Sequence, residues 1–113
     1  MFGFNQPVVP EIEASKVHEA LENNEDVIII DVRTPQEFSQ GNLEGSVNVP
    51  VDLVEAKIEE VVPDKDKTVY VYCLSGARSN MAVDAMVKKG YSNVYSMTSG
   101  LLSWRAKQYP ISA

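Results

Sequence analysis

Cysteine and histidine are scarce in this chain of 113 residues, which has one of each, Cys73 and His18. A single cysteine rules out an intramolecular disulfide, a CxxC redox pair and a zinc site built from several cysteines. A single histidine argues against a histidine-rich metal site. Long apolar runs are also missing, because the longest aliphatic run, Val27–Ile30, is far shorter than the roughly 20 residues of a membrane-spanning helix. These absences predict no metal centre and no membrane contact.

The amino-terminal residues have neither the basic cluster nor the long apolar stretch of a signal peptide, so we expect a cytoplasmic protein. With 44% hydrophobic and 23% charged residues, the composition is that of an ordinary globular protein. A chain of this length forms one domain. Pro7 and Pro10 indicate an amino-terminal arm over residues 1–11, followed by a single domain over residues 12–113.

Negative charge dominates, with a net charge of −6, which argues against nucleic-acid binding. The charge is unevenly placed: residues 1–66 hold 15 acidic and 4 basic side chains, whereas residues 67–113 hold 1 acidic and 6 basic ones. This asymmetry has two interpretations. The charges lie on solvated faces, or the carboxyl-terminal half builds a site for an anion.

Strand-like and helix-like segments alternate along the chain. Strands are predicted at 27–32, 47–49, 68–72 and 93–96, and helical segments at 16–23, 35–41, 53–62, 79–89 and 101–108. Such alternation implies parallel strands joined by crossovers, hence an α/β fold with an open sheet and helices on both faces. Ligands bind beyond the carboxyl ends of such strands, which directs attention to residues 31–33 and 73–79.

The strongest chemical signal is the segment 73–79, Cys-Leu-Ser-Gly-Ala-Arg-Ser, at a strand-to-helix junction. Loop N–H groups that turn inward there, together with a helix N-terminus, form a nest for an anion. A thiolate in such a nest is a good nucleophile. The other interpretation treats Cys73 as a buried apolar residue at a strand end. The surrounding residues favour a reactive site.

Several further side chains are expected to play no chemical part. We expect His18 to be a solvated helix residue and Trp104 to anchor the last helix in the core. Met81, Met86 and Met97 are interpreted as core-filling residues.

Five motifs occur in a characteristic order, at 30–38, 41–50, 73–79, 89–95 and 100–104. On these motifs the chain resembles the single-domain rhodaneses, a family of sulfurtransferases. The resemblance implies an open, mainly parallel five-stranded α/β sheet with helices on both faces. It also implies that the Cys73 thiolate takes a sulfane sulfur from thiosulfate, a polysulfide or a persulfide and becomes a persulfide. Cyanide or a thiol then accepts that sulfur, with no metal or organic cofactor, and another protein can serve as donor or acceptor.

The same resemblance assigns roles around Cys73. The substrate-binding residues are those of the loop, whose backbone N–H groups would stabilise the persulfide: Leu74, Ser75, Gly76, Ala77, Arg78 and Ser79. Arg78 either faces the incoming anion or pairs with Glu37 to hold the loop, and the pairing is favoured. Asp31 and Arg33, at the neighbouring strand end, are expected to support the loop by hydrogen bonds.

The chain departs from the family pattern in three places. Asn42 stands where a histidine is usual, and Thr98-Ser99-Gly100 replaces a common Glu-Gly-Gly, which alters one wall of the pocket. The loop also lacks the basic residues that some thiosulfate-using members carry beside the cysteine. This last departure weighs against thiosulfate as the physiological donor, but not against persulfide chemistry.

Two other functions remain open. A phosphatase or arsenate reductase of the related Cys-Arg type needs five residues between cysteine and arginine to surround a tetrahedral oxyanion, whereas four separate Cys73 from Arg78. A non-enzymatic sulfur carrier or binding module would keep the cysteine but act only with a specific partner.

Overall fold

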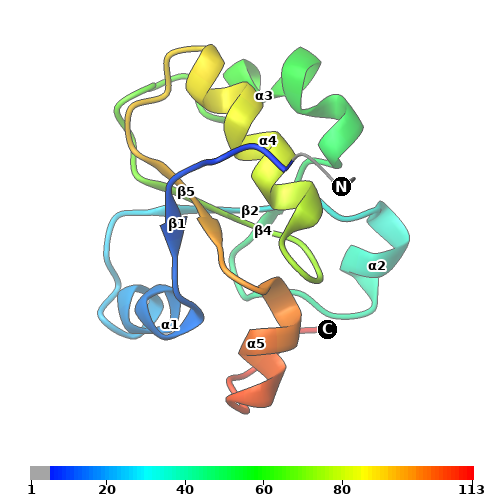
Figure 1. Cartoon of the computed structure of the whole chain (residues 1–113). Coiled ribbons are helices and arrows are strands. Elements are labelled where there is room, and N and C mark those ends of the chain that lie inside the picture. Colours follow the sequence, from blue (N-terminus) through cyan, green and yellow to red (C-terminus); the bar gives the residue numbers. More distant parts are fainter. Residues whose placement is uncertain (1–5) are drawn as a thin grey trace, which may run out of the picture.

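An open sheet of five strands organises residues 6–113, the part of the chain that this computed structural model describes (Figure 1). The strands are β1 (Glu11–Ile12), β2 (Ile28–Asp31), β3 (Val47–Asn48), β4 (Val69–Tyr72) and β5 (Val94–Met97), in the spatial order β1-β5-β4-β2-β3. Every pair of neighbouring strands is parallel. The fold class expected from the alternating pattern is confirmed.

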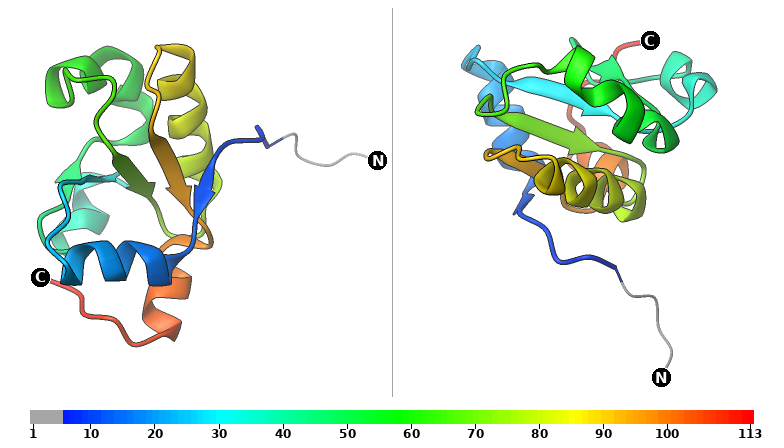
Figure 2. Two further views of the ribbon diagram at one scale, coloured as in Figure 1. Left: turned by 90° about the vertical axis from the view of Figure 1, so that its left-hand side faces the viewer. Right: turned by 90° about the horizontal axis from the view of Figure 1, so that it is seen from above.

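The edge strand β1 is the one strand that the sequence pattern did not predict. Glu11, assigned to the arm, pairs with Ser96 of β5, and the Ser96 N–H donates to the Pro10 carbonyl at 2.9 Å. Residues 6–10 lead away from the sheet, and Val8 is fully exposed (Figure 2). Residues 1–5 of the predicted arm lie outside the described residues. The arm therefore joins the sheet at its last residue, in a strand too short to show a periodicity.

Helices cover both faces of the sheet. They are α1 (Ala14–Glu22), α2 (Pro35–Ser39), α3 (Val54–Val61), α4 (Ala77–Lys88) and α5 (Gly100–Ala106), with a 3₁₀ turn, η1 (Val51–Leu53), before α3. α3 and α4 pack on one face, and α1 and α5 pack on the other (Figures 1 and 2). Because β2 and β4 lie inside the sheet, their side chains are buried alternately in these two layers.

The core has one layer on each face of the sheet. Ile30 and Val71 pack against Met86 of α4 on one face, and Tyr72 packs with Trp104 of α5 on the other. An aliphatic side chain buried in this way stabilises the fold by about 1.5–3 kcal/mol. Met86, Met97 and Trp104 are buried as expected. No helix among residues 6–113 is long and apolar enough to cross a membrane.

Two of the expected environments are wrong. Met81 is 56% exposed on α4 instead of filling the core, because its position is turned away from the sheet. The His18 side chain is only 26% exposed, since its ring stacks on Tyr109 with 3.9 Å between centroids and meets Trp104 edge-on, so it is less solvated than expected. The carboxyl-terminal segment that supplies Tyr109 follows α5 and folds back over α1, which the local pattern around His18 does not reveal.

Candidate active site

Cys73 directly follows β4, at the carboxyl edge of the sheet where the fold class predicts a ligand. α4 begins at Ala77, two residues earlier than the pattern predicted, so Arg78 and Ser79 lie in its first turn and not in a loop. Gly76 caps this helix with a φ of 113°, in the left-handed region that glycine adopts without a steric cost. This turn folds the chain back over the cysteine.

The sulfur of Cys73 lies inside the turn and is held by Gly76 and Ser79. The N–H groups of Gly76 and Ser79 point at Sγ, at 3.1 and 3.4 Å, and the Ser79 hydroxyl lies 3.6 Å from it. The cysteine residue is only 1% exposed. The predicted nest is therefore present around the sulfur, although two of the six loop N–H groups contact it and not all of them.

The remaining backbone donors of the turn are available to a ligand. Within residues 6–113, the N–H groups of Leu74, Ser75, Ala77 and Arg78 form no hydrogen bond with the protein. Unpaired N–H groups at a helix start carry partial positive charge and bind anions. The turn thus combines a buried cysteine sulfur with main-chain donors, and its basic side chain, Arg78, is paired with Glu37.

The amino end of α5 fixes the other side of the turn. The N–H of Leu101 donates to the Cys73 carbonyl at 2.9 Å, and the N–H of Leu102 donates to the Leu74 carbonyl at 3.0 Å. Gly100 makes this approach feasible, because a Cβ at this position would lie 2.3 Å from the Cys73 carbonyl oxygen. The position of the cysteine is therefore set by two helices, α4 and α5.

Arg78 pairs with Glu37, as the favoured interpretation of the sequence expected. Its Nη1 and Nη2 atoms donate to the two carboxylate oxygens of Glu37, at 2.8 and 3.2 Å. Glu37 also accepts from the Thr34 N–H and hydroxyl, in a capping box that begins α2. The Arg78 guanidinium, followed by the Thr34 N–H, lowers the pKa of Glu37 to about 2. The pair joins α2 to α4 and neutralises the arginine charge.

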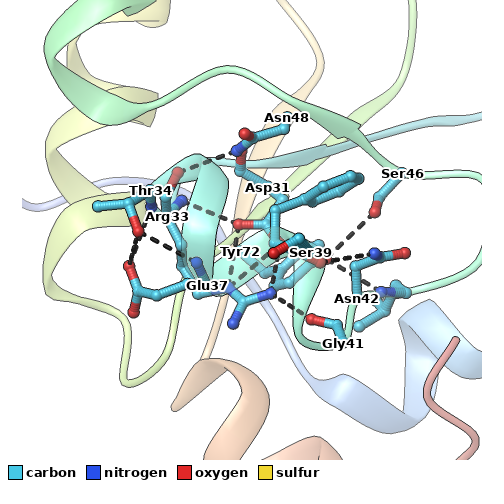
Figure 3. A network of polar contacts seen from close by, with 12 residues as sticks. Asp31, Arg33, Thr34, Glu37, Ser39, Gly41, Asn42, Ser46, Asn48 and Tyr72 are labelled. Atoms are coloured by element: carbon cyan, nitrogen blue, oxygen red, sulfur yellow. Dashed lines mark hydrogen bonds and ion pairs between the residues drawn. The ribbon is translucent and has the colours of Figure 1, made fainter. Parts of the chain in front are cut away.

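Asp31 and Arg33 form a second, buried ion pair, with 2.7 Å between Arg33 Nη2 and Asp31 Oδ2 (Figure 3). The expectation that they hold the cysteine loop by hydrogen bonds is wrong. Arg33 donates instead to the Gly41 carbonyl at 2.6 Å, and Asn48 donates to the backbone carbonyls of Asp31 and Arg33. Burial of a charge requires close partners, which here are the opposite charge of the pair and, for Arg33, the Gly41 carbonyl after α2.

Asn42 and Tyr72 complete the network drawn in Figure 3. The Asn42 amide donates to the Phe38 carbonyl at 2.8 Å, so it closes the end of α2. The Tyr72 hydroxyl accepts the Leu43 N–H at 3.0 Å and lies 3.2 Å from the Ser46 hydroxyl. Burial raises the pKa of the Tyr72 phenol, which keeps it neutral. These contacts fix the segment between α2 and β3.

A shallow hollow adjoins the cysteine turn. Thr98 and Ser99, which depart from the family pattern, line it together with residues 75–77, Asn80 and Glu11. The Thr98 hydroxyl donates to the Glu11 carboxylate at 2.8 Å. The substituted residues thus form one wall beside the turn, as expected from their position. This wall presents hydroxyl groups and the Glu11 carboxylate, so it adds no positive charge for an anionic donor.

Sequence reasoning missed two contributors to the site. Ser96 of β5 lies behind the turn, with its hydroxyl 2.8 Å from that of Ser79. The sequence feature that could have revealed Ser96 is its small polar side chain on a strand face that is otherwise apolar. The N–H donors of α5 had no such signal, because their role depends on how close α5 approaches. Among residues 6–113, no group of three or more histidine, cysteine, aspartate or glutamate side chains could hold a metal ion.

Comparison with known proteins agrees with the geometry of the turn. The family model described as Rhodanese-like domain matches residues 13–107. A sulfurtransferase from Allochromatium vinosum is 34% identical over 106 residues, which cover 94% of this chain and 97% of that protein. Thiosulfate sulfurtransferase PspE from Escherichia coli is 40% identical over 65 residues, which cover 58% of this chain and 62% of PspE. A solved rhodanese-related protein from Thermoplasma volcanium has a TM-score of 0.80 and 28% identity over 91% of this chain and 97% of that one.

Proposed function

The chain belongs to the rhodanese-like domain family, whose relatives include sulfurtransferases, and from this we propose that it transfers a sulfane sulfur through a persulfide on Cys73. The observation that carries the proposal is the position of the Cys73 sulfur inside a turn of backbone N–H donors at the start of α4. The donors are thiosulfate, a polysulfide or a persulfide, and the acceptors are cyanide in an assay or a thiol.

The reaction has two substitution steps at sulfur. In the first, the Cys73 thiolate attacks the sulfane sulfur of the donor, an S–S bond forms, and the donor's own S–S bond breaks. The leaving group, sulfite when the donor is thiosulfate, departs with the electron pair. In the second, the acceptor attacks the outer sulfur, the Cys73 S–S bond breaks, and the thiolate is regenerated. With cyanide the product is thiocyanate, and no other oxidant or reductant is consumed.

The turn suits an outer sulfur that carries negative charge. The N–H groups of Ser75, Ala77 and Arg78 have no protein partner among residues 6–113 and lie at the positive end of α4. Preorganised donors of this kind stabilise charge without reorganisation during the reaction. Arg78 contributes by holding the turn through Glu37. Asp31 and Arg33 are paired with each other, and Arg33 donates to the Gly41 carbonyl, so we assign them no direct role in holding the turn.

The same turn does not suit a phosphate monoester. Four residues separate Cys73 from Arg78, and the guanidinium is already engaged by both oxygens of Glu37. A phosphatase of the Cys-Arg type uses the arginine fork to hold the substrate oxyanion, which would require this pair to break. We therefore assign sulfur transfer and not phosphate hydrolysis.

One experiment tests the assignment. The protein is incubated with thiosulfate or with a polysulfide, and its intact mass is measured before and after addition of cyanide. We expect a gain of one sulfur atom that cyanide removes, with thiocyanate released repeatedly under turnover. Cys73→Ala and Cys73→Ser should neither gain sulfur nor release thiocyanate, and their circular dichroism should match that of the unchanged protein.

The possible results separate the remaining functions. Sulfur transfer in Cys73→Ala well above the uncatalysed rate contradicts the mechanism. Loading of one sulfur without turnover by cyanide or small thiols assigns a sulfur carrier instead. Absence of loading from every donor, together with hydrolysis of p-nitrophenyl phosphate, would assign the phosphatase chemistry that the sequence left open.

A further inference from the structure

Three buried side chains form a line behind the cysteine turn. The Cys73 sulfur lies 3.6 Å from the Ser79 hydroxyl, and that hydroxyl lies 2.8 Å from the hydroxyl of Ser96. They come from three elements, the end of β4, the first turn of α4, and β5. Ser79 and Ser96 are both fully buried. The line therefore runs from the nucleophile into the core and is closed to solvent.

Packing alone does not explain a serine at position 96. It pairs in register with Val71, and its strand neighbour on the same face is the buried Val94. A hydroxyl buried among apolar side chains costs free energy unless it is hydrogen-bonded. Among residues 6–113, its one hydrogen-bonded side-chain partner is Ser79, so the hydroxyl serves Ser79.

The number of protons decides the direction of each hydrogen bond. With a neutral thiol, the Cys73 S–H donates to the Ser79 oxygen, and the single Ser79 proton goes to the Gly76 carbonyl at 3.1 Å. Ser79 then has no proton left for Ser96, so Ser96 is the donor in the 2.8 Å contact. The two lone pairs of the Ser79 oxygen accept both bonds.

Loss of the Cys73 proton changes the hydrogen bond that the Ser79 hydroxyl donates and keeps the one that it accepts from Ser96. The sulfur anion can only accept, so the Ser79 O–H turns from the Gly76 carbonyl to the sulfur. That carbonyl keeps the Asn80 N–H at 2.9 Å and stays paired. Ser96 still donates to Ser79, which leaves the Ser79 proton directed at the sulfur and makes it a stronger donor.

We propose that Ser96 is a positioning residue that acts through Ser79 to hold a hydroxyl proton on the anionic sulfur of Cys73. The hydrogen bond from Ser79 to the anion is charge-assisted and therefore stronger than a neutral one. The same donor serves the thiolate before the reaction and the persulfide during it. The persulfide part rests on the proposed function, whereas the thiolate part does not.

The test measures the reactivity of the Cys73 sulfur without any sulfur donor. The rate of alkylation by iodoacetamide, a neutral reagent, is followed at neutral pH in the unchanged protein, Ser79→Ala, Ser96→Ala and the double variant. Ser46→Ala is the matched control, because it removes a hydroxyl that contacts Tyr72 and not the cysteine turn. Melting curves show whether each variant is folded.

We expect Ser96→Ala to slow alkylation about threefold to tenfold, which is the range of one neutral hydrogen bond. Ser79→Ala should be slower still, and the double variant should match Ser79→Ala because Ser96 acts through that residue. In the sulfur-transfer assay, Ser96→Ala should lower kcat by a similar factor and leave the KM of the donor unchanged.

Three results would overturn the inference: an unchanged alkylation rate in Ser96→Ala, additive losses in the double variant, or an equal loss in Ser46→Ala. Failure of the proposed function looks different. If the unchanged protein takes up no sulfur from any donor but the alkylation rates follow the expected order, sulfur transfer is rejected and the role of Ser96 stands.

Discussion

Replacement of Gly100 by alanine should displace Cys73 without changing any group that takes part in the proposed chemistry. Gly100 begins α5 with a φ of 47°, and a Cβ there would lie 2.3 Å from the Cys73 carbonyl oxygen and 2.7 Å from that of Leu74. Both obstacles are backbone atoms of the turn, so neither can rotate away. α5 and the turn must separate, which weakens the bonds from the Leu101 and Leu102 N–H groups.

The substitution should lower both the stability of the fold and the rate of sulfur transfer. The left-handed backbone costs an alanine about 1 kcal/mol, and overpacking in a close contact costs about 1–3 kcal/mol. Together they lower the free energy of unfolding by about 2–4 kcal/mol, or Tm by roughly 4 °C for each kcal/mol. A displacement of about 1 Å at a reacting group can reduce the rate about a hundredfold. We therefore expect a loss of sulfur transfer that is larger than the loss of stability alone explains.

Gly90→Ala is the matched control. Gly90 also has a positive φ, 98°, but a Cβ there meets only the Lys65 side chain, at an ordinary 3.8 Å. It should carry the backbone cost without displacing Cys73. Thermal unfolding and cyanide-dependent thiocyanate release are measured for both variants at a temperature where both are folded. Equal activity in the two variants, or unchanged stability in Gly100→Ala, would refute the reasoning.

Three further predictions concern the two ion pairs. Arg78→Lys should reduce sulfur transfer because an ammonium cannot bind both oxygens of Glu37, and Glu37→Gln should have a similar effect. The double variant should be little worse than either single variant, and clear additivity of the two losses would reject the pairing as their source. Because the pKa of Glu37 is lowered to about 2, its stabilising effect is present above its ordinary pKa and is lost as the pH falls toward about 2. The unchanged protein should therefore lose more Tm between about pH 5 and pH 2 than Glu37→Gln, and parallel curves would contradict this. Asp31→Asn leaves the charge of Arg33 buried without its partner and should cost about 3–5 kcal/mol in urea unfolding, whereas Asp26→Asn, at a side chain that is 90% exposed, should cost less than about 1 kcal/mol.

The sequence alone was enough to predict the layered α/β fold, because helix and strand periodicities are local. The apolar runs around Ile29 and Val71 identify strands buried on both faces, and both lie inside the sheet. The position of Cys73 followed from the same pattern, since a residue at the carboxyl end of a buried strand lies at the edge where ligands bind. The pairing of Glu37 with Arg78 was also favoured before the structure, by resemblance to the family.

Tertiary structure decided what depends on the distance between segments far apart in the chain. The two-residue strand β1 exists because it lies beside β5, and no period is visible in so short a segment. Arg33 donates to Gly41 because the turn after α2 passes over it, which no spacing in the sequence records. His18 and Met81 show the same limit, because a local pattern does not say which exposed face another segment covers.

The candidate active site shows most clearly which features the local sequence predicts and which depend on tertiary packing. The residues from Cys73 to Ser79 are contiguous, so the sequence was sufficient to propose Cys73 as the nucleophile and to predict backbone donors around its sulfur. The approach of Gly100 to the Cys73 carbonyl and the contact of Ser96 with Ser79 depend on the packing of α5 and β5 against the turn. Contacts of this kind form only when the whole sheet is assembled, because each one joins segments that meet through long-range packing and not through local chain geometry.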